Sequence, residues 1–411
     1  MKFMTDTQCA YVAGQNKELP LGGVGCHAYF EFSCGKINEI KLADAWETLF
    51  EYHCEMRAIY ANGIIMDLDD KPANSKLVVL DYRKDDEEEK LHKLKEFRNM
   101  FEARNCNTEH AECCGLWLIK LDEGKNLLAF DWSLIAGDVK SFVLVLDELA
   151  RLYSGETVDA IDNAAEILLE KRREAASNTK KIAEEIIETD VCNYPVDINL
   201  ELLEVPEKLS GCHYFSVDCW VDIKNIDALI GSEVDGKLMT AFVMALCDIT
   251  GDSGLLVNYP SFKRSTQETN SVGDFTDIKL IPIKYEKSIE ESVILRTNMD
   301  TYHRYMSFSG YKQVKIRRKI SKHFPNVKYI GPIVFSPVMD KPLLSEGFMN
   351  NIGTLSYMIS QTPQVWLDVQ TFYMGDKLLI SIVYPKEMFE REYVKRIADE
   401  YAEKIDKILN F

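Results

Sequence analysis

One carboxylate stands at the end of an apolar stretch late in the chain. The stretch Ile359–Asp368 reads Ile-Ser-Gln-Thr-Pro-Gln-Val-Trp-Leu-Asp. Pro363 lacks a backbone donor and belongs at the start or edge of a strand, after which the residues alternate between an apolar face and a face that carries Trp366 and Asp368. A carboxylate held in this way can take up and release a proton, as general acid–base catalysis requires. When the stretch is considered alone, a core strand whose Asp caps a turn explains it equally well.

A second group of chemically capable residues comprises Cys106, His110, Cys113 and Cys114. Thiolate and imidazole are ligands of zinc, but adjacent cysteines on a strand point to opposite faces, and this spacing corresponds to no common zinc pattern. The chain has 11 cysteines, an odd number, and no secretory signal, so we expect reduced thiols and no metal. No Gly-rich phosphate-binding loop is visible in the sequence.

Composition sets the size and class of the protein. A chain of 411 residues favours two domains of about 200 residues each. Hydrophobic residues at 46% and charged residues at 28% are ordinary for a globular protein. The net charge of −18 opposes binding to nucleic acid or to an anionic membrane. Because no apolar run reaches the roughly 20 residues that span a bilayer, we expect no membrane segment and a cytoplasmic location.

One local region opposes the acidic balance. Residues 312–322 are basic with apolar residues interleaved, as in a solvated amphipathic helix. The functional alternative is a docking site for an acidic partner or a phosphate, formed by Lys315, Arg317, Arg318 and Lys319.

Strand and helix patterns alternate in both halves of the chain, which indicates an α/β protein. In the first half we predict strands at Gly22–Cys34, Met56–Met66 and Lys76–Tyr82, a hairpin of Leu116–Leu121 with Asn126–Ile135, and helices around 42–50, 90–104, 139–153 and 157–189. In the second half we predict helices at Ala228–Ile249 and Glu390–Leu409 and strands at Gly211–Val221, Ile333–Ser336 and Lys377–Tyr384. Asp190–Lys208 is the crossing segment, in which Ile198–Val205 could itself pair as a strand.

Several motifs occur in the order found in one protein family. They are Gln8–Gly14, Leu21–His27, Met56–Ala58, Asn258 with Phe262–Arg264, Val272–Thr276, Ser307–Gly310, Ile333–Ser336 and Ser360–Asp368. With these motifs the chain resembles, over nearly its whole length, the heterocyclisation domains of nonribosomal peptide synthetases, which belong to the condensation-domain superfamily. The resemblance implies a two-lobed pseudodimer of the chloramphenicol-acetyltransferase type, with lobes at 1–189 and 190–411 and a substrate tunnel between them.

One motif departs from the family pattern. Heterocyclisation domains carry Asp, four residues, Asp, two residues and Ser, where ordinary condensation domains carry paired histidines. Asp138 and Ser141 fit the second half of this motif, but the first Asp position falls on Ser133, and the nearest carboxylate is Asp131. Either the strand contains a two-residue bulge or the position is changed. Two further differences are Ser336, where the family commonly has Thr, and Val369, where it commonly has His.

The resemblance implies a stand-alone enzyme that condenses a carrier-bound acyl group with carrier-bound Cys, Ser or Thr. It then cyclodehydrates the amide to a thiazoline or oxazoline. Ring closure needs a group that accepts the thiol or hydroxyl proton and later helps oxygen to leave as water, and Asp368 is the candidate. Ser336 would orient Asp368 or the departing oxygen by a hydrogen bond. The amides of Asn258 and Gln361 would hold substrate carbonyls, although Ser and Asn at strand ends more often bond local backbone.

The remaining site residues are expected to organise the tunnel. Asp138 and Ser141 stand near it or simply cap a helix, while the role of Asp131 stays open. Asp274 and Arg264 are expected to be structural, as a charge-assisted pair or as a turn stabiliser near the lobe interface.

The expected partners follow from the same resemblance. They are acyl or peptidyl carrier proteins acting in trans, with substrates on phosphopantetheine, and adenylation enzymes of the same pathway. We expect no directly bound cofactor, no nucleic acid and a monomer. A condensation-only enzyme and a catalytically silent docking module are the alternatives, and the mass of the product separates all three.

Overall fold

The computed structural model describes residues 2–159, 167, 179–194, 198–223, 232–262, 264, 270–308 and 312–409. The first half contains β1 (Lys2–Phe3), α1 (Asp6–Gly14), β2 (His27–Cys34), α2 (Glu39–Tyr52), β3 (Ala58–Ala61), β4 (Ile64–Asp67), β5 (Val78–Asp81), α3 (Glu87–Asn99), β6 (Cys114–Asp122), β7 (Lys125–Ser133) and α4 (Val139–Ser154). The second half contains α6 (Thr179–Val191), β8 (Tyr214–Asp222), α7 (Ser232–Thr250), β9 (Gly254–Ser261), β10 (Asp277–Lys284), α8 (Glu291–Ser307), α9 (Gln313–His323), β11 (Ile333–Val338), α10 (Glu346–Asn351), β12 (Gly353–Gln361), β13 (Leu367–Met374), β14 (Lys377–Pro385) and α11 (Arg391–Leu409).

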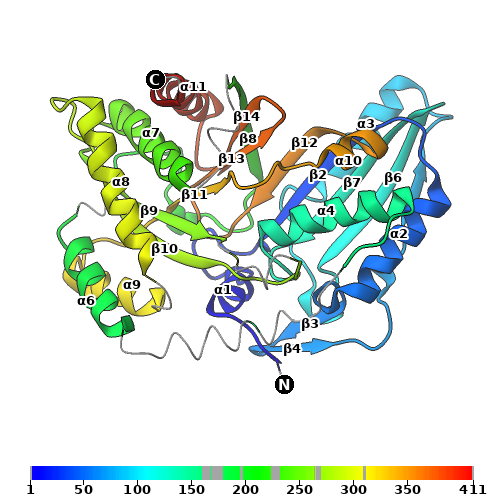
Figure 1. Cartoon of the computed structure of the whole chain (residues 1–411), viewed down its shortest axis with the longest axis horizontal. Helices are drawn as coiled ribbons and strands as arrows, with labels where there is room; N and C mark the ends of the chain where they lie inside the picture. The colour runs from blue at the N-terminus through cyan, green and yellow to red at the C-terminus, as the bar shows by residue number, and fades with distance from the viewer. Residues whose placement is uncertain are drawn as a thin grey trace.

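Two mixed β-sheets frame the molecule, one in each lobe (Figure 1). The first-lobe sheet has the strand order β12-β2-β7-β6-β5, and the second-lobe sheet has the order β10-β9-β11-β13-β14-β8. A small sheet, β1-β4-β3, lies beside the first. The predicted α/β fold with two lobes is confirmed.

Helix α4 shows how local sequence shapes the first lobe. Asp138 caps its N-terminus by accepting a hydrogen bond from the backbone N–H of Ser141, and Gly155 ends it with a φ of 87° in the left-handed region. One face buries Phe142, Val145, Leu146 and Leu149 against the sheet and α2. The helix predicted at 139–153 is therefore confirmed, with Tyr153 at its end only half-buried.

The second lobe is built around two helices that pack on one face of its sheet. Helix α11 confirms the helix predicted at Glu390–Leu409. Its apolar stripe is buried, with Val394, Ile397, Ala398, Tyr401 and Ile405 at 1% exposure or less, and Ile408 at its end is half-buried. Helix α7 lies beside it and is buried from Leu238 to Cys247.

One strand crosses from the second half of the chain into the first lobe. Strand β12 pairs antiparallel with β2, so that Ser360 lies opposite Ala28 and Gln361 opposite His27. The boundary at 189/190 stays a prediction, and the sheets themselves do not divide at a single point of the sequence.

One predicted strand is divided into two, and one alternative left open by the sequence is wrong. The stretch Met56–Met66 is a 3₁₀ turn followed by a hairpin, because Asn62 and Gly63 adopt positive φ (53° and 76°) and turn the chain. Residues 198–205 form no strand. Parts of the predicted helices at 157–189 and 228–249, and Ser309–Gly310 of one motif, lie outside the described residues.

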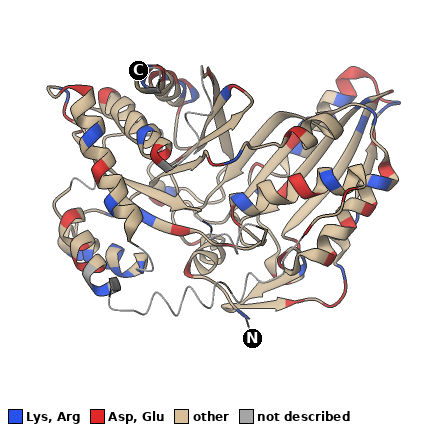
Figure 2. Cartoon of the chain, viewed as in Figure 1, with Lys and Arg blue, Asp and Glu red and all other residues tan. Residues whose placement is uncertain are grey.

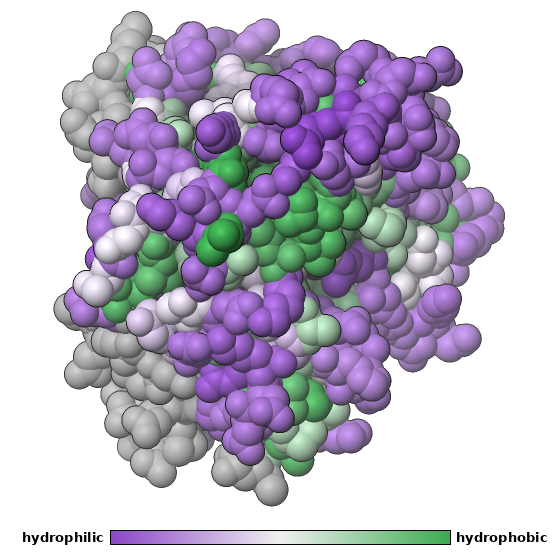
Figure 3. Space-filling view, turned by 90° about the vertical axis from the view of Figure 1, so that its right-hand side faces the viewer, coloured by the Kyte–Doolittle hydropathy of each residue, from purple (hydrophilic) through white to green (hydrophobic). Residues whose placement is uncertain are grey.

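The molecular surface is mostly polar, in agreement with the composition of the chain. Seen from the right-hand side of Figure 1, most of the face is polar around a limited apolar area (Figure 3). Among the helices that the structure describes, none is long and apolar enough to cross a bilayer.

Candidate active site

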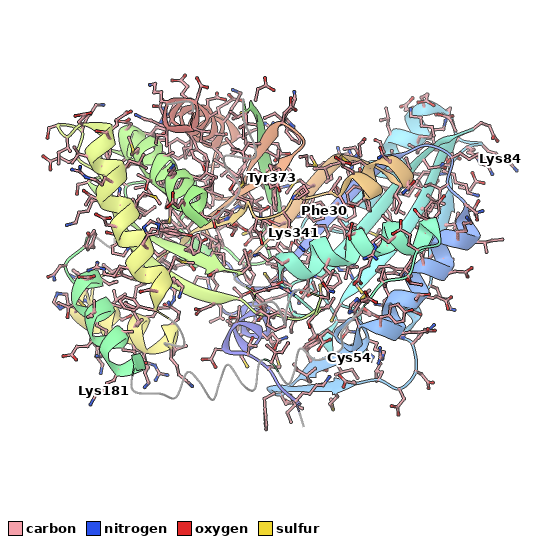
Figure 4. All side chains as sticks on the ribbon, in the orientation of Figure 1. Phe30, Cys54, Lys84, Lys181, Lys341 and Tyr373 are labelled. Atoms are coloured by element: carbon pink, nitrogen blue, oxygen red, sulfur yellow. The ribbon has the colours of Figure 1, made fainter. Side chains whose placement is uncertain are left out.

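A cavity of about 1140 Å³ lies between the lobes and is lined by residues from both. The first lobe contributes residues of α1, β2, β7 and α4, and the second contributes residues of β9, β11, β13 and α9. Figure 4 shows the side chains that fill this region, with Phe30 of β2 among those that border the cavity.

Asp368, the second residue of β13, faces this cavity and is 6% exposed. Its two carboxylate oxygens accept separate hydrogen bonds, one from the hydroxyl of Ser336 (3.1 Å) and one from the amide of Gln370 (2.9 Å). Burial raises the pKa of Asp368 to about 6, although hydrogen bonds from Gln370, Ser336 and Thr362 lower it. The predicted contact between Ser336 and Asp368 is confirmed, and its catalytic role stays a prediction.

Strand pairing explains why these side chains meet. Strands β11 and β13 run parallel with Ser336 opposite Gln370 and Val334 opposite Asp368. Alternate residues of a strand share a face, so Asp368 and Gln370 project to the same side as Ser336. Gln370 also donates to the hydroxyl of Ser360 on β12 (2.6 Å), which holds its amide in place.

Gln370 is a site residue that sequence reasoning missed. It stands two residues after Asp368, and strand alternation alone was enough to place both on one face. Gly14 was also overlooked: a Cβ there would overlap the ring of Pro363, so the glycine lets the loop that carries Thr362 approach α1.

A second carboxylate, Asp274, lines the same cavity. It is 1% exposed and accepts a hydrogen bond from the hydroxyl of Thr5 (2.7 Å). Burial raises its pKa to about 6. Its predicted partner, Arg264, is instead positioned against Asp138, so the expected Asp274–Arg264 pair is corrected to an Asp138–Arg264 pair.

Asp138 and Ser141 form a buried junction between α4 and the segment before β10. Arg264 pairs with Asp138 and donates to the hydroxyl of Ser141 (2.7 Å). That hydroxyl also accepts from the backbone N–H of Gly273 (3.0 Å) and donates to its carbonyl (2.9 Å). The backbone N–H of Phe275 donates to Asp138 (3.3 Å). Asp138, Ser141 and Arg264 join the lobes and do not themselves line the cavity, whereas Phe275 does.

Asp131 lies on the opposite face of the first-lobe sheet from the cavity. It is fully buried, 2.8 Å from the Nδ1 atom of His27 and 3.1 Å from the guanidinium of Arg104. The pairing of β7 with β2 and β6 is regular around it, so the bulge alternative is wrong and Ser133 occupies the first Asp position. Asp131 was expected among the residues of the tunnel. This expectation is wrong, because Asp131 does not line the cavity and forms a structural ion pair with Arg104.

The two predicted carboxamides differ in position. Asn258 of β9 is half-buried and lines the cavity beside Val334. The amide of Gln361 donates to the carbonyl of Gly25 (2.7 Å) and to that of Arg104, and its side chain does not line the cavity. The structure therefore supports Asn258, and not Gln361, as a residue that substrate can reach.

Helix α9 carries the predicted basic region, which Figure 2 shows in blue. Lys315 and Arg318 are exposed, and Lys319 pairs with Glu188. Arg317 is turned inward, lines the cavity and donates to the carbonyl of Ile330, and burial lowers its pKa to about 10. Arg317 therefore does not belong to the exposed patch.

The 11 cysteines are all free thiols. Among the described residues, no group of three His, Cys, Asp or Glu side chains is arranged to hold a metal ion. The absence of a cofactor stays a prediction.

Comparison with known proteins finds relatives that are similar over nearly the whole of this chain. No family model matches the chain. Pyochelin synthetase PchE of Pseudomonas aeruginosa is 25% identical over 412 residues, which cover 94% of this chain and 28% of that protein. Phenyloxazoline synthase MbtB of Mycolicibacterium paratuberculosis is 23% identical over 405 residues, covering 91% and 33%. The chain thus spans about a third or less of the length of these relatives.

Solved structures share the fold at lower identity. The cyclization-docking bidomain of the EpoB synthetase from Sorangium cellulosum superposes with a TM-score of 0.88 at 17% identity, over 99% of this chain and 85% of that one. The starter condensation domain of rhizomide synthetase RzmA superposes with a TM-score of 0.80 at 12% identity, over 100% and 95%.

Proposed function

We propose that this chain, which belongs to the condensation and cyclization domains of nonribosomal peptide synthetases, is a heterocyclisation catalyst. It would join a carrier-bound acyl group to carrier-bound Cys, Ser or Thr and close the side chain onto the new amide, giving a thiazoline or oxazoline. The observation that carries this proposal is the buried carboxyl of Asp368, which lines the cavity between the lobes and is held by Ser336 and Gln370.

In the first step the protein mainly has to orient the two reactants. The acceptor amine attacks the donor thioester, the carrier thiol leaves, and an amide forms. Holding both reactants in line in one cavity removes a large entropic barrier, equivalent to an effective concentration of about 10⁵ M or more in favourable cases. The half-buried amide of Asn258 is placed to hold a substrate carbonyl there.

The second step needs proton transfer at one place. The acceptor thiol or hydroxyl adds to the amide carbonyl carbon while the Asp368 carboxylate accepts its proton. The protonated acid then returns that proton to the former carbonyl oxygen, which becomes a hydroxyl group. As the C=N bond forms, the carboxylate takes the proton of the nitrogen and passes it to this hydroxyl group, which leaves as water. A pKa of about 6 lets Asp368 serve in both forms near neutral pH.

The partners of this reaction would be carrier proteins that present phosphopantetheine thioesters, loaded by adenylation enzymes. Neither step transfers an electron or a phosphoryl group, so we propose that the chain acts without a cofactor of its own.

The mass of the product on supplied carriers tests the proposal. An amide that has lost water supports heterocyclisation, an intact amide shows a condensation-only enzyme, and no product indicates a silent docking module. The condensation-only alternative is favoured by one observation, the Ser133 that replaces the first carboxylate of the Asp motif.

Ser336→Ala should slow ring formation more than amide formation. The lost hydrogen bond to Asp368 costs about 1–3 kcal/mol and does not remove the acid–base group itself. Rates of both steps, followed by mass spectrometry of the carrier, measure the split. Ser381→Ala is the matched control, because its hydroxyl donates to Asp218 in the same sheet but away from the cavity. Equal slowing of both steps by Ser336→Ala would remove its proposed role.

Charge reversal at Lys315 and Arg318 should raise the apparent KM for the carrier and flatten its salt dependence. Both side chains are exposed on α9, near the side of the cavity lined by Lys312 and Arg317. Attraction between exposed charges acts mainly on association and is screened by salt. Steady-state kinetics at several ionic strengths check this, with Lys95→Glu on the exposed face of α3 as control. An unchanged KM would exclude the patch from docking.

A further inference from the structure

The cavity has two chemically different ends. One end lies where β11 and β13 begin, beside the residues that precede them and α9, and it includes Lys312, Arg317 and Lys328. Two of these cations have partners within the protein. Lys328 pairs with Glu207 (2.7 Å), and Arg317 donates a hydrogen bond to the carbonyl of Ile330. Asp368 stands at this same end of β13.

The lining becomes apolar along the two strands. On β13 the residues that face the cavity are Asp368, Gln370 and then Phe372, and on β11 Ser336 is followed by Val338. Four residues of a strand span about 13 Å, so the apolar end lies roughly that far from the carboxylate. Phe372 and Val338 are 3% and 2% exposed, so they are shielded from solvent.

The first lobe completes the apolar end with aromatic rings. Phe30 of β2 and Phe142 of α4 both line the cavity, and their ring centroids are 4.3 Å apart. Trp132 of β7 also lines the cavity, and its indole N–H donates a hydrogen bond to the carbonyl of Gly137 (2.8 Å).

The charged side chains of the described lining come from elements other than β2, β7 and α4, which carry these rings. Those that the structure describes there are Asp6, Asp274, Asp277, Lys279, Lys312, Arg317, Lys328 and Asp368. None of them comes from β2, β7 or α4, or from β11 and β13 beyond Asp368. Lys140 of α4 pairs with Asp340 (2.6 Å), and neither residue lines the cavity.

We infer that this aromatic end is the subsite for the acyl group of the donor, and that it takes an uncharged, apolar acyl chain or ring. The inference rests on the proposed function. The acceptor must present an amine and a thiol or hydroxyl, which the apolar wall cannot pair, whereas an apolar acyl group gains by leaving water. A carboxylate on the donor acyl group would lose its hydration among these rings, and β2, β7 and α4 contribute no cation to the described lining that could pair with it.

Paired donors test the inference directly. Hexanoyl and adipoyl thioesters have the same carbon chain and differ by a terminal carboxylate. In competition for one acceptor, we expect amide formation from the hexanoyl donor to exceed that from the adipoyl donor by roughly 100-fold. A benzoyl thioester tests whether a ring is accepted as well as a chain. Equal use of hexanoyl and adipoyl donors overturns the inference while leaving the proposed function intact.

A substitution that fills the subsite gives an independent test. Ala28 of β2 is half-buried, lines the cavity and lies between Ser360 and Trp132 in the sheet. Ala28→Phe should lower use of hexanoyl donors at least tenfold relative to acetyl donors. Ala61→Phe, at a half-buried strand position away from the cavity, should leave the ratio unchanged. An unchanged ratio in Ala28→Phe also overturns the inference.

A binding measurement separates this inference from the proposed function. Hexanoyl- and adipoyl-pantetheine are titrated calorimetrically into the protein without acceptor. Selective binding of the hexanoyl compound supports the subsite even if no amide is ever formed, in which case only the proposed function fails. Binding of both compounds with equal affinity counts against the subsite whatever the catalytic result.

Discussion

Asp368→Asn is expected to accumulate the uncyclised amide on its carrier while condensation continues near the parent rate. Asparagine keeps the size and hydrogen bonding of the residue but cannot exchange a proton at neutral pH. Amide formation depends on orientation, whereas ring closure depends on the proton carried by Asp368, so ring closure alone should fall, by about 10²- to 10⁴-fold. Mass spectrometry of the carrier-bound product distinguishes the two species.

The pH dependence of the parent enzyme provides an independent readout. Ring closure starts from the ionised carboxylate, and the pKa of Asp368 is raised to about 6. Ring closure should therefore weaken as the pH falls through about 6. Asp218→Asn is the matched control, because Asp218 also accepts a serine hydroxyl and has a raised pKa but lies outside the cavity lining. Formation of the heterocycle by Asp368→Asn at the parent rate would disprove the assignment.

Asp138→Ala is expected to destabilise the whole protein. It removes a helix cap, worth about 1 kcal/mol, and it takes away the buried carboxylate that pairs with Arg264, for which a loss of about 3–5 kcal/mol is typical. Urea unfolding followed by circular dichroism measures the change. Because the junction joins the lobes, condensation and ring closure should decline together, in contrast to the effect of Asp368→Asn.

Asp86→Ala separates the two contributions. Asp86 caps α3 in the same way, by accepting from the backbone N–H of Glu89 (2.9 Å), but it is exposed. Asp86→Ala should therefore lower the free energy of unfolding only by the contribution of a helix cap, about 1 kcal/mol. Similar free energies of unfolding for Asp138→Ala and Asp86→Ala would show that the Arg264 pair adds nothing to stability.

The features that sequence predicted well depend on local pattern or motif order. The stripe of α11 follows from a helical period, and the cap at Asp138 follows from a polar residue before an apolar run. The contact between Ser336 and Asp368 was predictable because both residues stand in motifs that occur in a known order.

What sequence did not predict depends on pairing between distant segments. The place of Gln370 against Ser360 requires β12 and β13 to meet. The structural pairing of Asp131 requires the segment after α3, which carries Arg104, to pack behind the sheet. Arg317 looked like one more surface cation, because the sequence does not show which side of α9 faces the cavity. The Asn62-Gly63 pair, by contrast, is a local sequence signal for a hairpin turn and was overlooked.

The crossing of β12 also constrains how the lobes can move. Since β12 is hydrogen-bonded along β2 and continues through residues 362–366 into β13, opening of the cavity must bend the chain at that short connection. The Gln370 amide spans the same place, with Ser360 on one side and Asp368 on the other. A hinge motion that separates β12 from β13 would therefore stretch the hydrogen bond that fixes this amide and release the carboxylate from its orientation. Opening of the cavity and orientation of the Asp368 carboxylate are in this way mechanically coupled.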